Sequence, residues 1–118
     1  MPNSLESIKA DFFKALGHPA RIRIVKALRA GELSVGQIQE ELGLEQSVVS
    51  QQLGVLRAKG LIDPRRSGTS VYYSVADDKV FELLDIARAM FDQQLQSLQA
   101  IADEDDARQD GLAETEPA

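Results

Sequence analysis

The sequence contains no cysteine among its 118 residues, and His18 is its only histidine. Disulfides, thiolate metal sites and thiol redox switches are therefore excluded. The chain also lacks a glycine-rich phosphate loop and any His/carboxylate metal motif. These absences leave no group of residues suited to catalysis, so we expect a protein that is not an enzyme.

Long hydrophobic runs are missing as well. No apolar run approaches the roughly 20 residues that a membrane-spanning helix needs, and no charged-then-apolar start suggests a signal peptide. The apolar fraction of 43% and the charged fraction of 27% are typical of an ordinary soluble domain. We therefore expect a cytoplasmic protein without a membrane partner.

The formal net charge of −6 is confined to one end of the chain. Residues 103–118 hold seven acidic residues and one arginine, so residues 1–102 are neutral overall. Between residues 46 and 76, four basic residues stand against one acidic residue, a local balance of +3. Because electrostatic steering depends on local charge, the acidity does not exclude a nucleic-acid partner. We predict one folded domain over residues 1–102 and a disordered acidic tail over residues 103–118.

Apolar residues recur at steps of three and four through the first 30 residues, the period of amphipathic helices. A first helix is predicted over about residues 5–16, before the interruption at Gly17. A second is predicted from Pro19, which suits a first helical position, to about Ala30. The predicted apolar faces are Leu5, Ile8, Phe12 and Leu16 in the first helix, and Ile22, Val25 and Leu28 in the second.

The middle of the chain predicts two short helices joined by a tight turn. Ser34 can cap a helix over residues 35–42, and Gly43 supplies the positive φ that a sharp turn needs. The next helix is predicted over residues 46–59 and ends at Gly60. Its two faces differ in chemistry: one is apolar, with Val49, Leu53 and Leu56, and the other carries small and amide side chains, with Gln46, Ser47, Ser50 and Gln51.

A basic hairpin is predicted directly after these helices. Residues 61–65 and 70–75 have the composition of strands, and residues 67–69 form the loop between them, with Gly68 supplying the turn. Helix, turn, reading helix and basic hairpin in this order match what the DNA major groove and its phosphates require. The predicted fold class is mainly α with a small β-hairpin wing, a winged helix-turn-helix in the order α-α-α-α-β-β-α.

The last predicted helix runs from about Asp77 to Ala102 and carries a long apolar stripe. One small winged domain offers too little apolar surface to cover both terminal helices. We therefore expect a homodimer through the first and last helices, which would place two reading helices in major grooves about 34 Å apart. The predicted interface residues are Leu5, Ile8, Phe12, Leu84, Ala87, Met90, Phe91 and Leu98.

The sequence resembles the ArsR/SmtB family of dimeric winged helix-turn-helix repressors over about residues 8–95. The resemblance rests on four segments in order: LGHPARIRIV at 16–25, LEQSVVSQQL at 44–53, LRAKGLI at 56–62 and RSGTSVYY at 66–73. It implies that the 46–59 helix enters the major groove of double-stranded operator DNA and that the 65–70 hairpin contacts the neighbouring backbone.

The residue chemistry agrees with those roles. Gln46 and Gln51 can present an amide donor and acceptor to a base edge, and Val48 can contact a thymine methyl group. Small hydroxyl side chains and arginines suit phosphates. The predicted DNA-binding residues are Gln46, Ser47, Val48, Ser50, Gln51, Arg57, Arg65, Arg66, Thr69 and Ser70.

The chain departs from the family pattern at two DNA-facing positions. Thr69 stands just after the wing glycine, where relatives often have a second basic residue. Glu45 stands where the reading helix usually starts with Ser or Thr, and its carboxylate would repel a nearby phosphate.

The metal sites that the resemblance would imply are not matched by suitable ligands. The family's cysteine site would need thiolates near residues 33–36, where this chain has Ser34. The terminal-helix site falls on Asp77, Lys79, Met90 and Gln93, of which only Asp77 is a credible ligand for nickel, zinc or cobalt. His18 and Asp77 remain as candidates for a non-standard His/carboxylate site, although a helix-capping role explains each more simply.

Three sources of regulation stay open: a small organic effector, a sensing partner protein, or a divalent transition metal held by a rudimentary site or by that partner. The leading function is a DNA-binding transcriptional regulator acting as a homodimer on a pseudo-palindromic operator. The alternatives are a winged-helix protein-interaction module without DNA binding and a metal-responsive repressor.

Overall fold

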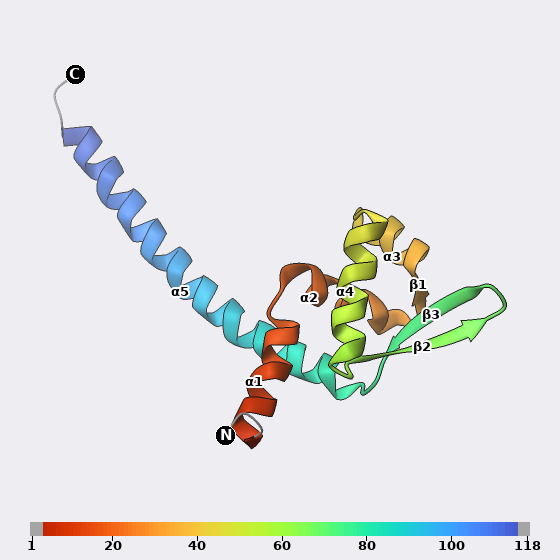
Figure 1. The fold of residues 1–118 in the computed structure, drawn as a ribbon. Helices are drawn as coiled ribbons and strands as arrows, with labels where there is room; N and C mark the ends of the chain where they lie inside the picture. Colours follow the sequence, from red (N-terminus) through yellow and green to blue (C-terminus); the bar gives the residue numbers. More distant parts are fainter. Residues whose placement is uncertain (1–3, 116–118) are drawn as a thin grey trace. The chain divides into compact units, whose positions relative to one another are not determined.

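A computed structural model describes the backbone of residues 4–115 and the side chains of residues 4–105 and 107. It has five α-helices, one short 3₁₀ helix and a three-stranded sheet among the described residues (Figure 1). The predicted class, mainly α with a β-hairpin wing, is confirmed. One compact unit ends at Phe81 and a second begins at Glu82.

The two N-terminal helices begin at side-chain caps. In α1 (Leu5–Leu16), the Ser4 hydroxyl accepts a hydrogen bond from the backbone N–H of Ser7. In α2 (Pro19–Ala27), Nδ1 of His18 accepts from the N–H of Ala20 at 3.1 Å. The predicted end of α2 at Ala30 was too late, because the last turn tightens into the 3₁₀ helix η1 (Leu28–Ala30).

The predicted helix-turn-helix is present as α3 (Val35–Leu42) and α4 (Gln46–Ala58). Ser34 and Gln37 cap α3 reciprocally: the serine hydroxyl accepts from the glutamine N–H, and the glutamine side chain accepts from the serine N–H. Gly43 ends α3 with φ of +68°, the left-handed conformation expected at this turn. Glu45 precedes α4 and makes no side-chain capping bond.

The sheet has one strand more than predicted. Strands β2 (Ile62–Ser67) and β3 (Ser70–Val75) form the expected hairpin around Gly68 and Thr69, with φ of +61° at the glycine. Strand β1 (Leu33–Ser34) adds to β3, so the order is β1-β3-β2, all antiparallel. A two-residue strand is too short to show a period, and only tertiary pairing with Tyr72 and Tyr73 defines it.

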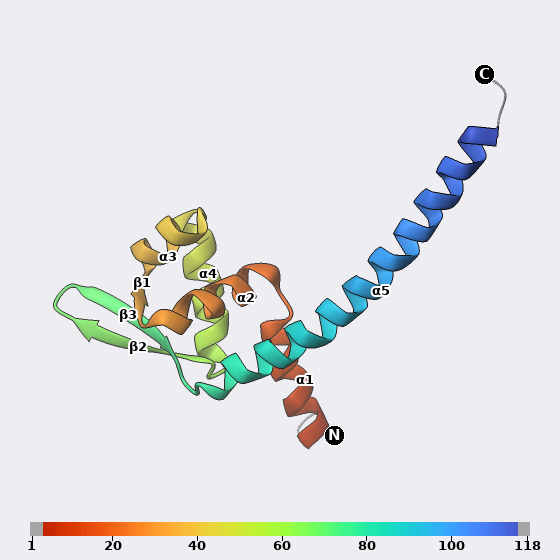
Figure 2. The ribbon, with the colours of Figure 1, turned by 180° about the vertical axis from the view of Figure 1, so that it is seen from behind.

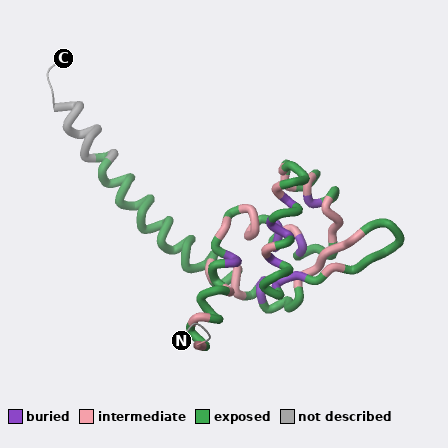
Figure 3. The backbone as a smooth tube through the Cα atoms, viewed as in Figure 1, coloured by how far each residue is buried: buried purple, intermediate pink, exposed green. Residues whose placement is uncertain are grey.

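The core lies where α2, α3 and α4 meet, as the buried positions of Figure 3 show, and it extends to the base of the wing. Ile24, rather than the predicted Ile22, is buried in α2 together with Val25. In α1 only the C-terminal end is buried, whereas Leu5 and Ile8 are exposed. The buried apolar residues are Ala15, Leu16, Ile24, Val25, Leu28, Ile38, Val49, Leu53, Leu56, Leu61, Ile62, Val80 and Phe81.

Helix α5 (Lys79–Thr115) is longer than predicted (Figure 2). It starts after Asp77, whose Oδ1 accepts from the N–H of Lys79 at 2.9 Å. The predicted end of this helix at Ala102 was too early, because α5 continues to Thr115, whereas the predicted disorder of the acidic tail stays a prediction. Residues 103–115 are mostly good helix formers, and the first proline after them is Pro117. Residues 116–118 lie outside the described part, and the division into a 1–102 domain and a tail stays a prediction.

The apolar stripe of α5 is largely uncovered in a single chain. Six of its large side chains are more than half exposed: Ile86, Met90, Phe91, Leu95, Leu98 and Ile101. Leu84 and Ala87 are partly buried. Among the described residues, no helix combines the length and the hydropathy that crossing a membrane would require.

Candidate nucleic-acid interface

Helix α4 separates the predicted base-reading residues from the core. Its inward face buries Val49, Leu53 and Leu56. The opposite face exposes Gln46, Ser47, Ser50, Gln51 and Arg57, whereas Val48 is partly buried at the edge. The structure therefore brings the predicted reading residues of α4 onto one accessible helix face.

Gly54 lies in the middle of that exposed face, one helical turn beyond Ser50 and one turn before Arg57. A Cβ atom built on Gly54 would meet no heavy atom within 4 Å. A glycine inside a helix is less stable than alanine by about 0.5–1 kcal/mol, so packing within this chain gives no reason for the residue. Close approach of a ligand backbone is one of the reasons for which glycine is used. Gly54 was not among the residues predicted for the interface.

A buried polar contact fixes the other side of α4. Gln52 is the buried polar residue among the described positions, with 8% of its surface exposed. Its Oε1 accepts from Nη1 of Arg21 at 2.9 Å. The same guanidinium donates through Nε to the carbonyl of Ala15 at 2.5 Å and through Nη2 to that of Lys14 at 3.2 Å. Arg21 thus links the C-terminal end of α1 to the reading helix.

The turn between α3 and α4 is also tied to α2. Nη2 of Arg23 donates to the carbonyl of Leu42 at 2.8 Å. The N–H of Gly43 donates to the carbonyl of Gln39 at 2.8 Å. Both bonds satisfy carbonyls at the end of α3 that have no partner within the helix. The angle at which α4 leaves the turn is therefore set by contacts from α2 and α3.

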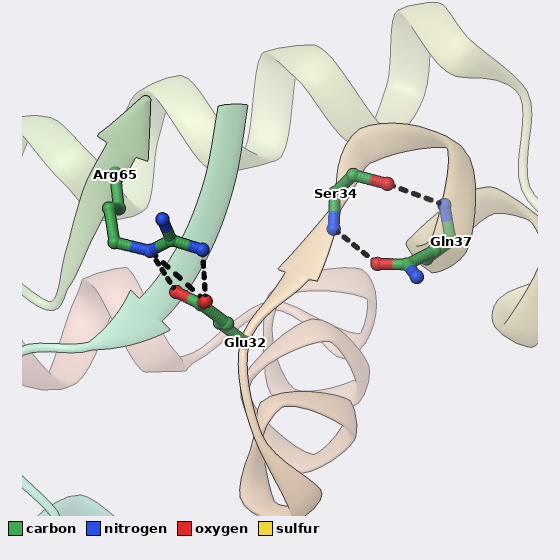
Figure 4. A network of polar contacts seen from close by, with 4 residues as sticks. All are labelled: Glu32, Ser34, Gln37 and Arg65. Atoms are coloured by element: carbon green, nitrogen blue, oxygen red, sulfur yellow. Dashed lines mark hydrogen bonds and ion pairs between the residues drawn. The ribbon is translucent and has the colours of Figure 1, made fainter. Parts of the chain in front are cut away.

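In the wing, Arg65 is paired with a carboxylate that was not among the predicted site residues. Nε of Arg65 donates to both oxygens of Glu32, at 3.1 and 2.9 Å, and Nη2 donates to Oε1 (Figure 4). The guanidinium also lies over the ring of Tyr72, 5.3 Å from its centroid. Arg65 therefore carries a charge that is already paired within the chain, and its predicted role in DNA binding stays a prediction.

The pair shifts the ionisation of both partners. The hydrogen bond from Arg65 lowers the pKa of Glu32 below its ordinary value, and the nearby positive charge acts in the same direction, while desolvation opposes them. The hydrogen bond to Glu32 and then its charge raise the pKa of Arg65. Both groups stay ionised at neutral pH, so the contact persists as a charge-assisted bond.

The remaining predicted wing residues lie near the hairpin tip. Arg66, Thr69 and Ser70 are all exposed. Arg66 directly follows Arg65 in β2, yet it makes no ion pair among the described residues. The two consecutive arginines thus have different surroundings.

The candidate metal ligands have local structural roles. His18 caps α2 through Nδ1, and Asp77 caps the start of α5 through Oδ1, which are the plainer roles that the sequence suggested. In the part of the chain that is described, no three His, Cys, Asp or Glu side chains gather as a metal site would require.

Known proteins resemble this chain in both sequence and structure. A family profile described as "Bacterial regulatory protein, arsR family" matches residues 18–63. An uncharacterized HTH-type transcriptional regulator of Mycobacterium tuberculosis, Rv0081, is 49% identical over 85 residues, which cover 71% of this chain and 75% of that protein. The biofilm growth-associated repressor of Agrobacterium fabrum is 42% identical over 82 residues, or 70% of each chain.

Solved structures of transcriptional regulators also resemble this chain. The crystal structure of M. tuberculosis Rv0081 superposes with a TM-score of 0.73 at 45% identity, covering 80% of this chain and 96% of that one. A solution structure of Mb0332 from Mycobacterium bovis, described as a homodimeric winged helix-turn-helix DNA-binding domain, has a TM-score of 0.70 at 32% identity. It covers 77% of this chain and 84% of that one.

Proposed function

This chain belongs to the ArsR/SmtB family of bacterial transcriptional regulators, and from that premise we propose that it binds double-stranded DNA as a homodimer. It is a regulator, not an enzyme. In the proposed complex, α4 of each protomer reads one half of a pseudo-palindromic operator, and the wing contacts the adjacent backbone.

The exposed face of α4 is the observation that carries this proposal. Amide and hydroxyl side chains occupy its first turns, and Arg57 occupies its last, while the opposite face is buried. Glutamine can pair bidentately with adenine in the major groove, and serine can bond bases or phosphates. The excess of acidic over basic residues lies after residue 102, so the net charge of −6 does not describe the surface around α4.

The uncovered apolar side chains support the homodimer. Leu5 and Ile8 of α1 and the stripe of α5 expose large apolar groups in the isolated chain. Such side chains are normally covered by a partner, and a twofold-symmetric copy of the same chain is the commonest one. The homodimeric description of the M. bovis relative points in the same direction. The interface residues proposed for this chain are those predicted from its sequence.

Regulation in this proposal comes from an effector or from a sensing partner protein. The family's terminal-helix positions carry Lys79, Met90 and Gln93, which are poor ligands for zinc, nickel or cobalt. His18 and Asp77 already act as caps. A metal response would therefore depend on a non-standard site or on a partner.

Binding of the full chain to a fluorescently labelled promoter duplex, titrated at two salt concentrations, tests the proposal. The wild-type protein should prefer this duplex to a scrambled one of equal length, and binding should weaken steeply with salt. Gln51→Ala should reduce the preference by about 1–3 kcal/mol, the value of one bidentate base contact. Gln96→Ala, which alters an exposed glutamine of α5, is the matched control and should retain it.

One result would contradict the proposal, and a second would correct the role of a single residue. Absence of any sequence-dependent binding by the wild-type protein would favour a winged-helix module that binds proteins. An unchanged preference in Gln51→Ala would leave DNA binding in place and remove the role assigned to that residue.

A further inference from the structure

The β2–β3 hairpin places its two consecutive arginines on opposite faces. Successive side chains of a strand alternate between faces, and residues paired across strands share a face. Arg65 pairs with Tyr72, whereas Arg66 pairs with Val71. Arg65 therefore lies on the face that meets Glu32, and Arg66 lies on the other face.

The face that carries Arg66 is the one that packs on the reading helix. Ile62, Pro64 and Arg66 of β2 share this face with Val71 and Tyr73 of β3. Ile62 is buried, and the N–H of Leu61 donates to the carbonyl of Leu56 at 2.9 Å, which joins the base of this strand to the end of α4. The hairpin thus extends from the C-terminal end of α4 with Arg66 turned toward that helix.

A pocket of about 390 Å³ lies between the last turn of α4 and this face of the wing. It is lined by Arg57 from α4, by Pro64 and Arg66 from β2, and by Val71 and Tyr73 from β3. The reading helix and the wing therefore meet at one hollow. Apart from two guanidinium groups, the side chains that line it are apolar or aromatic.

Neither guanidinium is neutralised within the described part of the chain. Arg57 and Arg66 make no side-chain hydrogen bond or ion pair there, in contrast to Arg65 with Glu32. The nearest acidic residue in the strand, Asp63, alternates onto the opposite face with Arg65. Two like charges beside one pocket repel each other unless an anion lies between them.

The pocket is aligned with the residues that would read bases. Arg57 follows Gln46 by eleven positions and Ser50 by seven, so the three side chains lie along one side of α4. A duplex whose major groove receives the first turns of α4 would bring a backbone strand past the last turn. Phosphate, like carboxylate, matches the geometry of planar guanidinium groups and is bound through paired N–H donors.

We propose that the Arg57–Arg66 pocket receives one phosphate of the DNA backbone, held jointly by both arginines, and that Arg65 is a positioning residue of the wing. This inference rests on the proposed function and deepens it, because it separates the roles of Arg65 and Arg66. The pocket joins the reading helix and the wing to a single point on the duplex, so it fixes the register of α4 in the groove.

The test uses the full chain and a fluorescein-labelled duplex of about 30 base pairs, with binding measured by anisotropy between about 50 and 200 mM KCl. Arg57→Ala and Arg66→Ala should each weaken binding about tenfold, the effect of removing one charge-assisted hydrogen bond. Each should also make the slope of log affinity against log salt shallower, by about 0.9 for each phosphate that the variant no longer neutralises.

The double variant and a neighbouring arginine complete the experiment. Because both side chains hold the same phosphate, the double variant should bind more tightly than the product of the two single effects predicts. Arg65→Ala removes an equal charge from the adjacent position, but that charge is already paired with Glu32, so the salt slope should change less than in Arg66→Ala. Circular dichroism melts of all variants check that each remains folded.

Three outcomes distinguish the ideas. If Arg57→Ala and Arg66→Ala bind as the wild type does while Arg65→Ala has a shallower salt slope, the pocket is wrong and DNA binding stands. If the wild-type protein itself binds no duplex, the proposed function fails, and the pocket assignment fails with it. If Arg66→Ala abolishes saturable binding of inorganic phosphate in calorimetry but leaves duplex affinity and salt slope as in the wild type, the pocket is a free-anion site, which overturns its assignment to the DNA backbone.

Discussion

At the scale of single residues, charges in the wing and near α4 are arranged by specific partners. Arg65 is fixed by Glu32 and Tyr72, and Arg21 is fixed by Gln52 and by carbonyls at the end of α1. Neither contact touches the proposed DNA ligand. Both contacts instead position neighbouring side chains of the interface. Removing either contact should therefore affect the stability of the fold and the ordering of the wing first.

The Glu32–Arg65 pair predicts a pH-dependent effect. The pKa of Glu32 is lowered in the folded chain, so its contribution to stability is present above its ordinary value of 4.5 and is lost as pH falls through the folded value. Glu32→Gln should be slightly less stable than the wild type at neutral pH, and the difference should vanish in acid. The pair is exposed, so high salt should shrink the effect.

Thermal melts between neutral and acidic pH measure this difference. Glu40→Gln, which alters an exposed carboxylate of α3, reports the general effect of removing one negative charge. A difference between wild type and Glu32→Gln that grows as pH falls would contradict the stabilising role of the pair.

Two adjacent glutamines of α4 should behave in opposite ways. Gln52→Leu removes the acceptor of Arg21 Nη1 and leaves a charged donor without its partner, so unfolding free energy should fall by about 1–3 kcal/mol. Gln51→Leu changes an exposed side chain and should leave stability nearly unchanged. Urea denaturation measures both. Equal stability of the two variants would show that the Arg21–Gln52 contact contributes nothing.

At the scale of elements, the inner face of α4 is buried in the core, and its exposed outer face carries a glycine in the middle of the helix. Gly54 is surrounded by open space, and alanine would be preferred there for helix stability alone. The glycine gives the chain no packing advantage. In the proposed complex, close approach of the DNA backbone to α4 accounts for the glycine.

Gly54→Ala should therefore separate stability from binding. The free energy of unfolding should rise by about 0.5–1 kcal/mol, and the affinity for a duplex should fall. Gly36→Ala is the matched control, since Gly36 is also helical with open space around its Cβ position, and it lies outside the α4 face. It should stabilise the chain with little change in affinity. Tighter DNA binding by Gly54→Ala would contradict close approach at this point.

The elements themselves could largely be predicted from the sequence, because hydrophobic period, capping residues and turn glycines act locally. Ser34 and Gly43 marked the bounds of α3 correctly. Strand β1 could not be predicted, because its two residues are extended only through pairing with β3. The different surroundings of Arg65 and Arg66 also could not be predicted, since they depend on β2 continuing to Ser67 and on a loop carboxylate 33 positions away.

At the scale of the whole molecule, the isolated chain leaves large apolar side chains exposed to water, and burying them requires a partner. Phe91 and Leu98 are 59% and 61% exposed, which is costly for large apolar groups in water. A second copy that covers them would also supply the second reading helix. Dimerisation and operator reading are thus linked in the proposed function.

Phe91→Glu tests that link. An acidic side chain at an exposed position should not unfold the chain, but it should prevent burial against a partner, so sedimentation should shift from dimer to monomer. Duplex affinity should fall with it. Gln96→Glu adds the same charge to a polar position of α5 and should leave the dimer intact. A Phe91→Glu protein that sediments as the wild type does would place the interface elsewhere.

The most direct test of the central claim is selection of duplexes from a random library by the full-length wild-type protein. We predict recovery of one motif made of two inverted half-sites, separated by about one helical turn or a multiple of it, roughly 10–10.5 base pairs between centres. That result requires two reading helices related by twofold symmetry. Recovery of no enriched sequence, or of a single half-site without its inverted copy, would contradict operator reading by a homodimer.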